Sequence, residues 1–309
     1  MKIGLQQPFF NFPGKDNEIG ATLIAIAKTA ESSGFSSFWL MDHFYQVGQG
    51  SGRYTDRMLE AYVSLGFLAG VTEKIKLGTL VTGSIYRNPG LLVKMVTTLD
   101  VLSKGRAYLG IGTGWFKEEA EAFGLTFPES RKELISRFVE TLKIAKHIWA
   151  YEGDFKGRYW SLKSPVTNPP PVTKPHPPIL IGCEGETTML KIVARYADAI
   201  NMHAGTPLPG YGEWLRVRYD NKKRDLSRKL GILEKNCEQY GRDFLSIEKT
   251  ALATIQIDDE NMSVDEVIRL CIDLNDIGLN QVIFNMPNAY LLDPLKEIGM
   301  HVIPEIKDL

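Results

Sequence analysis

Short apolar stretches rich in β-branched and aromatic residues alternate along the chain with longer segments in which apolar residues recur every three or four positions. This alternation is typical of βα units built around a parallel sheet. It predicts eight strands, at residues 2–7, 36–41, 75–81, 106–111, 178–182, 198–202, 250–257 and 281–286.

The same periodicity places helices between the predicted strands. In the segments 134–149 and 264–274 the apolar residues fall on one helical face. Gly34, Gly105 and Gly278 follow three of the predicted helices, and glycine adopts the left-handed conformation that often ends a helix. We therefore expect each of these helices to end at its glycine.

Eight βα units without a break in composition favour a single domain over residues 1–309. The predicted fold class is α/β, a TIM (β/α)8 barrel with insertions, because a doubly wound sheet usually stops at five or six strands. A bare barrel takes about 250 residues, so insertions are predicted at 43–57, 115–130, 151–177 and 203–222. The insertions 43–57 and 203–222 follow strands, which places them on the face where barrel enzymes keep their sites.

Composition narrows the class of partner. The 309 residues carry 36 Lys and Arg against 37 Asp and Glu, so no broad positive field is available to bind nucleic acid. Three cysteines are widely spaced without a Cys-x-x-Cys pair, which fits a reducing compartment. No apolar run approaches the ~20 residues that span a bilayer. We therefore expect a cytoplasmic protein with a small-molecule substrate and no nucleic-acid or membrane partner.

The residues that follow the predicted strands are polar and rich in glycine. Asp42 and His43 are the strongest candidates for proton chemistry, because histidine titrates near neutrality and a neighbouring carboxylate can orient it. The alternative is a histidine that is buried and hydrogen-bonded for structural reasons. The other strand-end candidates are Gln6, Thr79, Gly112, Thr113, Gly182, Cys183, Glu184, Gly185, Asn201 and His203.

Three further patterns leave alternatives open. The segment 110–115 differs from a dinucleotide fingerprint in the position of its third glycine, so its glycines indicate either a close approach of a ring or backbone, or a tight turn. The segment 182–188 precedes a helix and could bind an anion, or Glu184 could simply complement the helix dipole. Arg87 could face an anionic cofactor tail, or only lead into a helix that Asn88 caps. No metal-binding spacing is found, and no metal is expected.

Several runs of sequence together resemble the bacterial luciferase-like superfamily, and within it the oxidoreductases that depend on the deazaflavin coenzyme F420. The match is carried by Phe38–His43, Leu77–Thr82, Arg87–Pro89, Leu99–Arg106, Gly110–Trp115, Pro178–Gly182 and Leu190–Ala199. The resemblance covers most of residues 1–202.

This resemblance implies a homodimeric barrel with the cofactor ring over the strand ends and its phosphate near the fifth strand. It implies a non-prolyl cis peptide at Thr79–Leu80, and it gives His43 the role of proton donor or acceptor, with Asp42 orienting it or touching the ring. The residues expected to bind the cofactor are Gln6, Thr79, Leu80, Gly112, Thr113, Gly182, Cys183, Glu184, Gly185 and Asn201.

The substrate is less well defined by the resemblance. The sugar-phosphate dehydrogenases of this superfamily carry a catalytic glutamate where this chain has Trp115, so oxidation of glucose 6-phosphate is not expected. Trp115 and His203 are expected to line the substrate pocket, and the aromatic loop 43–57 to help select the substrate.

The leading hypothesis is hydride transfer between C5 of coenzyme F420 and a small organic substrate. An alternative is a luciferase-like monooxygenase that depends on FMN and is supplied by a separate reductase. A protein that binds flavin or deazaflavin without turnover is a further alternative, because a fold alone does not guarantee chemistry.

Overall fold

The barrel predicted from the sequence is confirmed. In the computed structural model of this chain, residues 1–47, 54–205 and 213–309 are described, with residues 213–221 described by their backbone alone. Their barrel strands are β1 (Lys2–Gln7), β2 (Ser37–Leu40), β3 (Lys76–Thr79), β4 (Thr82–Gly83), β5 (Leu109–Gly112), β8 (Ile179–Gly182), β9 (Ala199–Gly205), β10 (Glu248–Thr254) and β11 (Gln281–Asn285).

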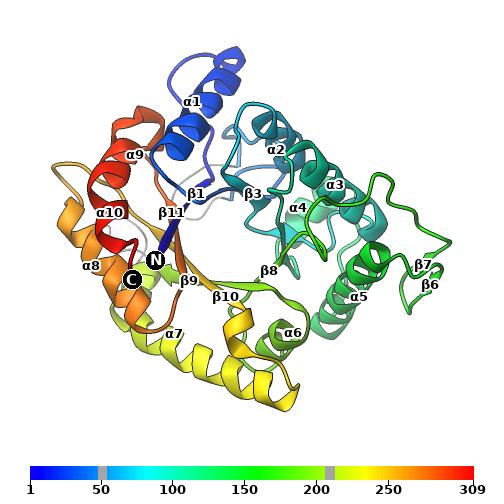
Figure 1. The fold of residues 1–309 in the computed structure, drawn as a ribbon. Helices are drawn as coiled ribbons and strands as arrows, with labels where there is room; N and C mark the ends of the chain where they lie inside the picture. The colour runs from blue at the N-terminus through cyan, green and yellow to red at the C-terminus, as the bar shows by residue number, and fades with distance from the viewer. Residues whose placement is uncertain (48–53, 206–212) are drawn as a thin grey trace.

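These strands are parallel and pair in the order β3-β2-β1-β11-β10-β9-β8-β5-β4 (Figure 1). The third predicted strand, 75–81, is represented by β3 and β4 together. The described strands therefore occupy eight positions of a nearly closed barrel. Its closure lies where β4 pairs with β5 and where Leu77 pairs with Ala107.

Helices surround the barrel as the periodicity predicted. They are α1 (Ile19–Ser32), α2 (Ala61–Ala69), α3 (Pro89–Leu102), α4 (Lys117–Ala122), α5 (Arg131–Ala150), α6 (Met189–Tyr196), α7 (Glu213–Gln239), α8 (Val264–Asp276), α9 (Asp293–Glu297) and α10 (Ile303–Ile306). Gly34, Gly105 and Gly278 have φ values of 92°, 85° and 92°, so each adopts the left-handed conformation expected after a helix. The side chain of Asn88 caps α3, and Pro89 is its first residue. Within the described ranges, no helix combines the length and apolar character needed to cross a bilayer.

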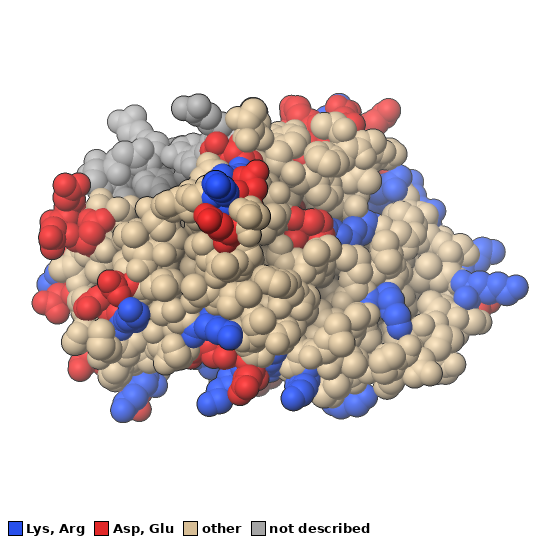
Figure 2. Space-filling view, turned by 90° about the horizontal axis from the view of Figure 1, so that it is seen from above, with Lys and Arg blue, Asp and Glu red and all other residues tan. Residues whose placement is uncertain are grey.

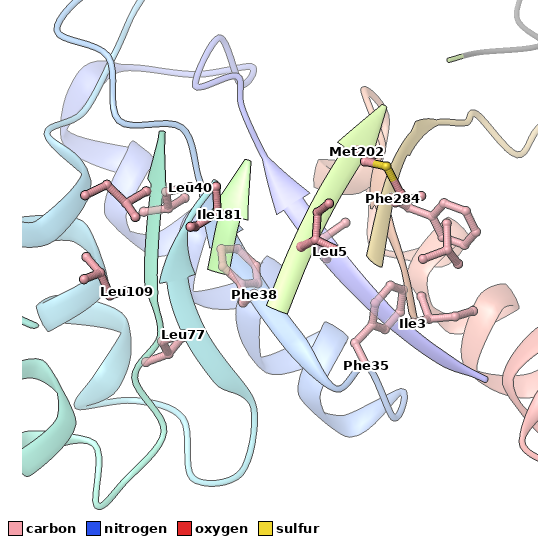
Figure 3. Close-up of a cluster of buried hydrophobic side chains, with 14 of the residues drawn as sticks. Ile3, Leu5, Phe35, Phe38, Leu40, Leu77, Leu109, Ile181, Met202 and Phe284 are labelled. Carbon is pink, nitrogen blue, oxygen red and sulfur yellow. The ribbon is translucent and has the colours of Figure 1, made fainter. Parts of the chain in front are cut away.

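The hydrophobic core has two parts because successive strand residues point to opposite faces of the sheet. Ile179 and Ile181 belong to the large cluster between strands and helices, of which Figure 3 shows Ile181 with its neighbours. Leu180, between them in sequence, belongs to a smaller cluster inside the barrel with Trp39, Leu80, Ala199, Leu252 and Ile283. This inner cluster fills the barrel interior, so a ligand is accommodated at its end.

The predicted insertions differ in how much of them is described. Residues 48–53 of the insertion 43–57 and residues 206–212 of the insertion 203–222 lie outside the described residues. The insertion 115–130 contains α4. The insertion 151–177 contains a hairpin of β6 (Phe155–Lys156) and β7 (Ser161–Leu162), which was not predicted because each strand is only two residues long. The surface in Figure 2 carries acidic and basic side chains with uncharged areas between them.

The third strand position is interrupted between β3 and β4, where the peptide bond Leu80–Val81 is cis. The expected location, Thr79–Leu80, is therefore wrong by one bond. Backbone pairing explains the difference, because the Leu80 N–H still donates to the carbonyl of Leu40 at 2.8 Å. The Leu80 carbonyl accepts a hydrogen bond from Nε2 of Gln6 at 3.0 Å. Leu80 thus remains part of the strand pairing, and the chain departs only after it.

Glycines of the neighbouring strands make room for this interruption. A Cβ atom at Gly110 would lie 1.7 Å from the carbonyl oxygen of Thr79. Cβ atoms at Gly112 and Gly182 would lie 3.0 Å and 2.9 Å from Cγ2 of Val81. The alternatives for the glycine-rich segment are thereby decided for Gly110 and Gly112, which permit close approach of backbone and side chain.

We expect Gly110→Ala to lower the free energy of unfolding by about 1–3 kcal/mol or more, because the added methyl group must displace the Thr79 carbonyl. Urea denaturation followed by circular dichroism measures this change. Gly231→Ala is the matched control, since nothing lies within 4 Å of its Cβ position. In a helix interior that change should raise stability by up to about 1 kcal/mol. Equal effects of the two substitutions would contradict the close-approach argument.

Candidate active site

A cavity of about 470 Å³ lies at the carboxyl ends of the barrel strands. Most of the residues predicted for the site line it, namely Gln6, His43, Leu80, Gly112, Thr113, Trp115, Gly182, Cys183, Glu184, Asn201 and His203. Among the described residues predicted for the site, Asp42, Thr79 and Gly185 are not part of its lining. The lining also includes residues that were not predicted, among them Val81, Tyr86 and Asn285.

His43 is held in the cavity wall by a carboxylate that is distant in sequence. Its Nδ1 atom lies 2.8 Å from Oε2 of Glu119, which is carried by α4. With Glu119 ionised, Nδ1 carries the proton of the neutral imidazole. Nε2 is then the unprotonated nitrogen, and it is available to a molecule in the cavity. A histidine fixed in this way is suited to accept or donate a proton.

Glu119 is fully buried, with 0% of its side chain exposed. Its other partners are the backbone N–H of Phe44 at 2.6 Å and the hydroxyl of Tyr86, which donates to Oε2. Burial alone would raise the pKa of Glu119. The hydrogen bonds from His43, Tyr86 and Phe44 outweigh burial and hold this pKa below its usual value. The carboxylate is therefore ionised at neutral pH and fixes the ring of His43.

Glu119 was not predicted as a site residue from the sequence. Its segment, 117–122, contains three glutamates, and Glu118 and Glu121 are exposed while Glu119 is buried. The available signal was position, because α4 lies in the insertion after β5 and so at the end of the barrel that holds the site. Burial of only one of three glutamates on a short helix is not visible in the sequence.

The expectation that Asp42 orients His43 is wrong. Asp42 is buried and forms two hydrogen bonds with Arg87, at 2.5 Å and 2.9 Å. His43 lines the cavity, whereas Asp42 does not. Burial raises the pKa of the Asp42 carboxyl, and Arg87 opposes this rise. Arg87 also donates a hydrogen bond to Glu60 at 2.5 Å, so two carboxylates of the protein, Asp42 and Glu60, already neutralise its charge.

Thr79 and Gly185 support the wall of the cavity without lining it. Oγ1 of Thr79 donates to the carbonyl of Gly110 at 2.8 Å and lies 2.8 Å from Oγ1 of Thr82. The carbonyl of Gly185 accepts a hydrogen bond from the thiol of Cys183 at 3.3 Å. Burial raises the pKa of Cys183 to about 12, so this cavity residue remains a neutral thiol.

Glu184 also lines the cavity, and its charge is balanced by lysines of α7. Its carboxylate lies 2.8 Å from Nζ of Lys229 and 3.5 Å from Nζ of Lys222, and it accepts the backbone N–H of His203 at 2.8 Å. Although burial works against it, these contacts hold the pKa of Glu184 below its usual value. The predicted anion site at 182–188 thus already contains a carboxylate paired with cations. Glu184 complements these lysines, and α6 begins only at Met189.

Aromatic side chains form one side of the cavity mouth. Trp115 stacks on Phe116 with ring centroids 4.9 Å apart, and its centroid lies 5.9 Å from that of His43. The indole is 57% exposed although it lines the cavity. Such an exposed ring beside His43 offers an apolar surface to the outer part of a ligand.

Amide side chains lie on other sides of the cavity. Nδ2 of Asn201 donates to Oγ1 of Thr250 at 2.8 Å, and Nε2 of Gln6 donates to the Leu80 carbonyl. Oδ1 of Asn285 is buried and has no hydrogen-bond partner among the described residues. In the same part of the chain, no group of three or more His, Cys, Asp and Glu side chains is arranged to hold a metal ion.

A family model described as luciferase-like monooxygenase matches residues 1–259. The chain belongs to the luciferase-like monooxygenase family. This match confirms the luciferase-like family that the sequence resembles. Membership of this family makes the chain an enzyme of the oxidoreductase class.

Three known proteins illustrate the relationship. The F420-dependent glucose-6-phosphate dehydrogenase of Kineococcus radiotolerans is 30% identical over 264 residues, which cover 84% of this chain and 69% of that protein. A solved F420-dependent secondary alcohol dehydrogenase in complex with an F420-acetone adduct gives a TM-score of 0.78 at 19% identity, covering 99% of this chain and 98% of that chain.

The third is the FMN-bound oxygenating constituent of 3,6-diketocamphane monooxygenase from Pseudomonas putida. It gives a TM-score of 0.76 at 16% identity and covers 99% of both chains. At these identities the two structural similarities establish the fold alone. They confirm the luciferase-like barrel over almost the entire chain.

We expect Glu119→Gln to reduce stability by about 1–3 kcal/mol at pH 7, because a buried acceptor of several hydrogen bonds is altered. Folding lowers the pKa of Glu119, so its ionised form stabilises the protein above the usual value of 4.5. This contribution is lost as the pH falls through the lower, folded value. The difference between wild type and variant should therefore shrink below pH 4.5.

Urea denaturation between pH 7 and the acid limit of folding measures this pH dependence. Glu121→Gln is the control on the same helix, because the Glu121 side chain is 57% exposed and its ion pair with Lys117 is also at the surface. That substitution should change stability by less than about 0.5 kcal/mol. A Glu119→Gln effect that is independent of pH would show that the charge of Glu119 is not what stabilises the site.

Proposed function

We propose that this chain is an F420-dependent oxidoreductase that moves a hydride between C5 of the deazaflavin and a small organic substrate. The observation that carries the proposal is the position of His43, in the wall of the strand-end cavity with Nδ1 bound to buried Glu119. The F420-dependent relative, 30% identical to this chain, supports the choice of cofactor.

The residues of the cavity fit a flat ring that carries polar groups along one edge. Val81 occupies the space left by Gly112 and Gly182, so the cavity has an apolar floor at the end of the barrel. Gln6, Asn201 and Asn285 supply amide groups, and the unpartnered Oδ1 of Asn285 would accept a hydrogen bond from a ring N–H. These residues would hold a deazaflavin ring against the floor.

When bound, the deazaflavin supplies the carbon that accepts or donates the hydride. In the oxidising direction, Nε2 of His43 accepts the proton of a substrate hydroxyl while the carbon bearing that hydroxyl loses its hydride. Glu119 stabilises the resulting imidazolium through Nδ1–H. In the reducing direction the same nitrogen returns the proton to the oxygen of a carbonyl.

Trp115 is expected to contact the substrate rather than the reacting proton. It stands where the resemblance places a catalytic glutamate in sugar-phosphate dehydrogenases, and indole has no group that titrates near neutral pH. Its exposed ring suits a substrate with an apolar group. We therefore propose a small alcohol or carbonyl compound as substrate in preference to a sugar phosphate.

An FMN-dependent monooxygenase is a second candidate, supported by the similar TM-scores of 0.76 and 0.78 for an FMN-bound monooxygenase and an F420-dependent dehydrogenase. The two candidates differ in whether turnover consumes oxygen. The homodimer and the separate cofactor reductase that the resemblance implies stay predictions.

We expect His43→Gln to lower kcat by about 10²–10⁴-fold, because the substitution removes the proton acceptor. The Kd for F420 should change little, because a side chain of similar size remains in the cavity wall. The assay follows reduction of F420 by a panel of secondary alcohols. His301→Gln is the control, since His301 is exposed and lies in the C-terminal segment near α10. A His43→Gln variant that keeps wild-type kcat would contradict the proposed role.

We expect Trp115→Ala to raise KM for alcohols with an apolar group by about tenfold, which corresponds to about 1.4 kcal/mol of lost contact. The value of kcat should change much less, because the indole takes no part in proton transfer. Phe123→Ala is the control: Phe123 is also exposed and aromatic but does not line the cavity. Equal changes in KM at the two positions would contradict a contact between Trp115 and the substrate.

A further inference from the structure

A second cavity, of about 450 Å³, lies between the C-terminal parts of α5 and α6. Its walls include Lys143, Lys146 and Trp149 of α5, Phe155 of the β6–β7 hairpin, His176 before β8, and Tyr196 at the end of α6. Figure 1 shows α5 and α6 next to each other on the outside of the barrel. The cavity shares no lining residue with the strand-end cavity. It lies near the start of β8, and so at the opposite end of the barrel.

Two of its walls are aromatic rings with fixed positions. Nε1 of Trp149 donates to Oγ1 of Thr97 at 2.9 Å, which holds the indole in place. The ring of His176 stacks on it, with centroids 5.2 Å apart and an interplanar angle of 14°. Nδ1 of His176 lies 2.9 Å from the carbonyl of Pro177, so this ring is fixed as well. The stacked rings cover each other on one side, so a flat ligand ring can contact only the parts of the two rings that line the cavity, and these need no rearrangement.

The cavity also holds two lysines, Lys143 and Lys146, that form no ion pair with a carboxylate of the described residues. Lys143 and Lys146 are one turn apart on α5, and among the described residues neither ammonium group lies within ion-pair distance of a carboxylate. Glu152, also at the cavity, is held by His147 at 3.1 Å. Burial lowers the pKa of Lys146 and the charge of Asp198 opposes this shift without an ion pair, while the ammonium group lies 6.0 Å from the centroid of Tyr196. An anion in the cavity would stabilise these charges.

We propose that this second cavity binds a planar aromatic carboxylate, with its ring against Trp149 and His176 and its carboxylate at Lys143 and Lys146. Aromatic walls alone would favour any flat apolar molecule, and lysines alone would favour any small anion. Their combination in one cavity selects a molecule that has both features. The strand-end chemistry uses none of these residues, so this is a separate site.

Titration of the full chain with 2-naphthoate, by isothermal titration calorimetry, tests the site. The neutral amide 2-naphthamide has the same ring without the charge, and acetate has the charge without the ring. We expect saturable binding of 2-naphthoate, with binding of the other two weaker by about tenfold or more, because each lacks one of the two kinds of contact.

Lys146→Gln should weaken binding of 2-naphthoate by about tenfold, the loss expected for one charge-assisted hydrogen bond. Lys235→Gln, at an exposed position of α7, is the matched control and should leave binding unchanged. Trp115→Ala should also leave it unchanged, which separates this site from the strand-end cavity. The proposal is overturned if 2-naphthamide binds the wild-type chain as tightly as 2-naphthoate, if Lys146→Gln binds like wild type, or if no saturable binding occurs.

Discussion

A buried carboxylate needs hydrogen-bond donors, and the organisation of the active site depends on how this chain supplies them to Glu119. Its donors are the ring of His43 and the backbone N–H of Phe44, in the segment after β2, and the hydroxyl of Tyr86, in the segment after β4. Together they attach α4 to the loop after β2. Satisfying one buried charge therefore also fixes the ring of His43, to which we assign the proposed proton transfer.

The interrupted third strand provides the surface beside this histidine. Gly110 allows the Thr79 carbonyl to approach β5, and Gly112 and Gly182 leave room for the side chain of Val81. The resulting floor lies above the inner cluster that fills the barrel. A flat cofactor placed there would lie within the same cavity as His43 and Trp115. The glycines thus shape the cavity floor by allowing the interrupted third strand to pack closely against β5 and β8.

Local sequence patterns predicted the barrel because strand and helix periodicities are properties of short segments. They also predicted most of the cavity, since the residues after parallel strands meet at one end of a barrel. They did not predict the pairing of His43 with Glu119 or of Asp42 with Arg87, which join residues 76 and 45 positions apart. Such contacts depend on which side chains are buried together, and this follows only from the complete fold.

The proposed hydride transfer requires that the strand-end cavity bind a deazaflavin. It is tested most directly by titrating the purified chain with oxidised coenzyme F420 and, separately, with FMN, and following the fluorescence of each. We expect saturable binding of F420 with a Kd in the micromolar range, about −8 kcal/mol, and binding of FMN that is weaker by about tenfold or more. FMN binding as tight as that of F420, or no binding of F420, would contradict it.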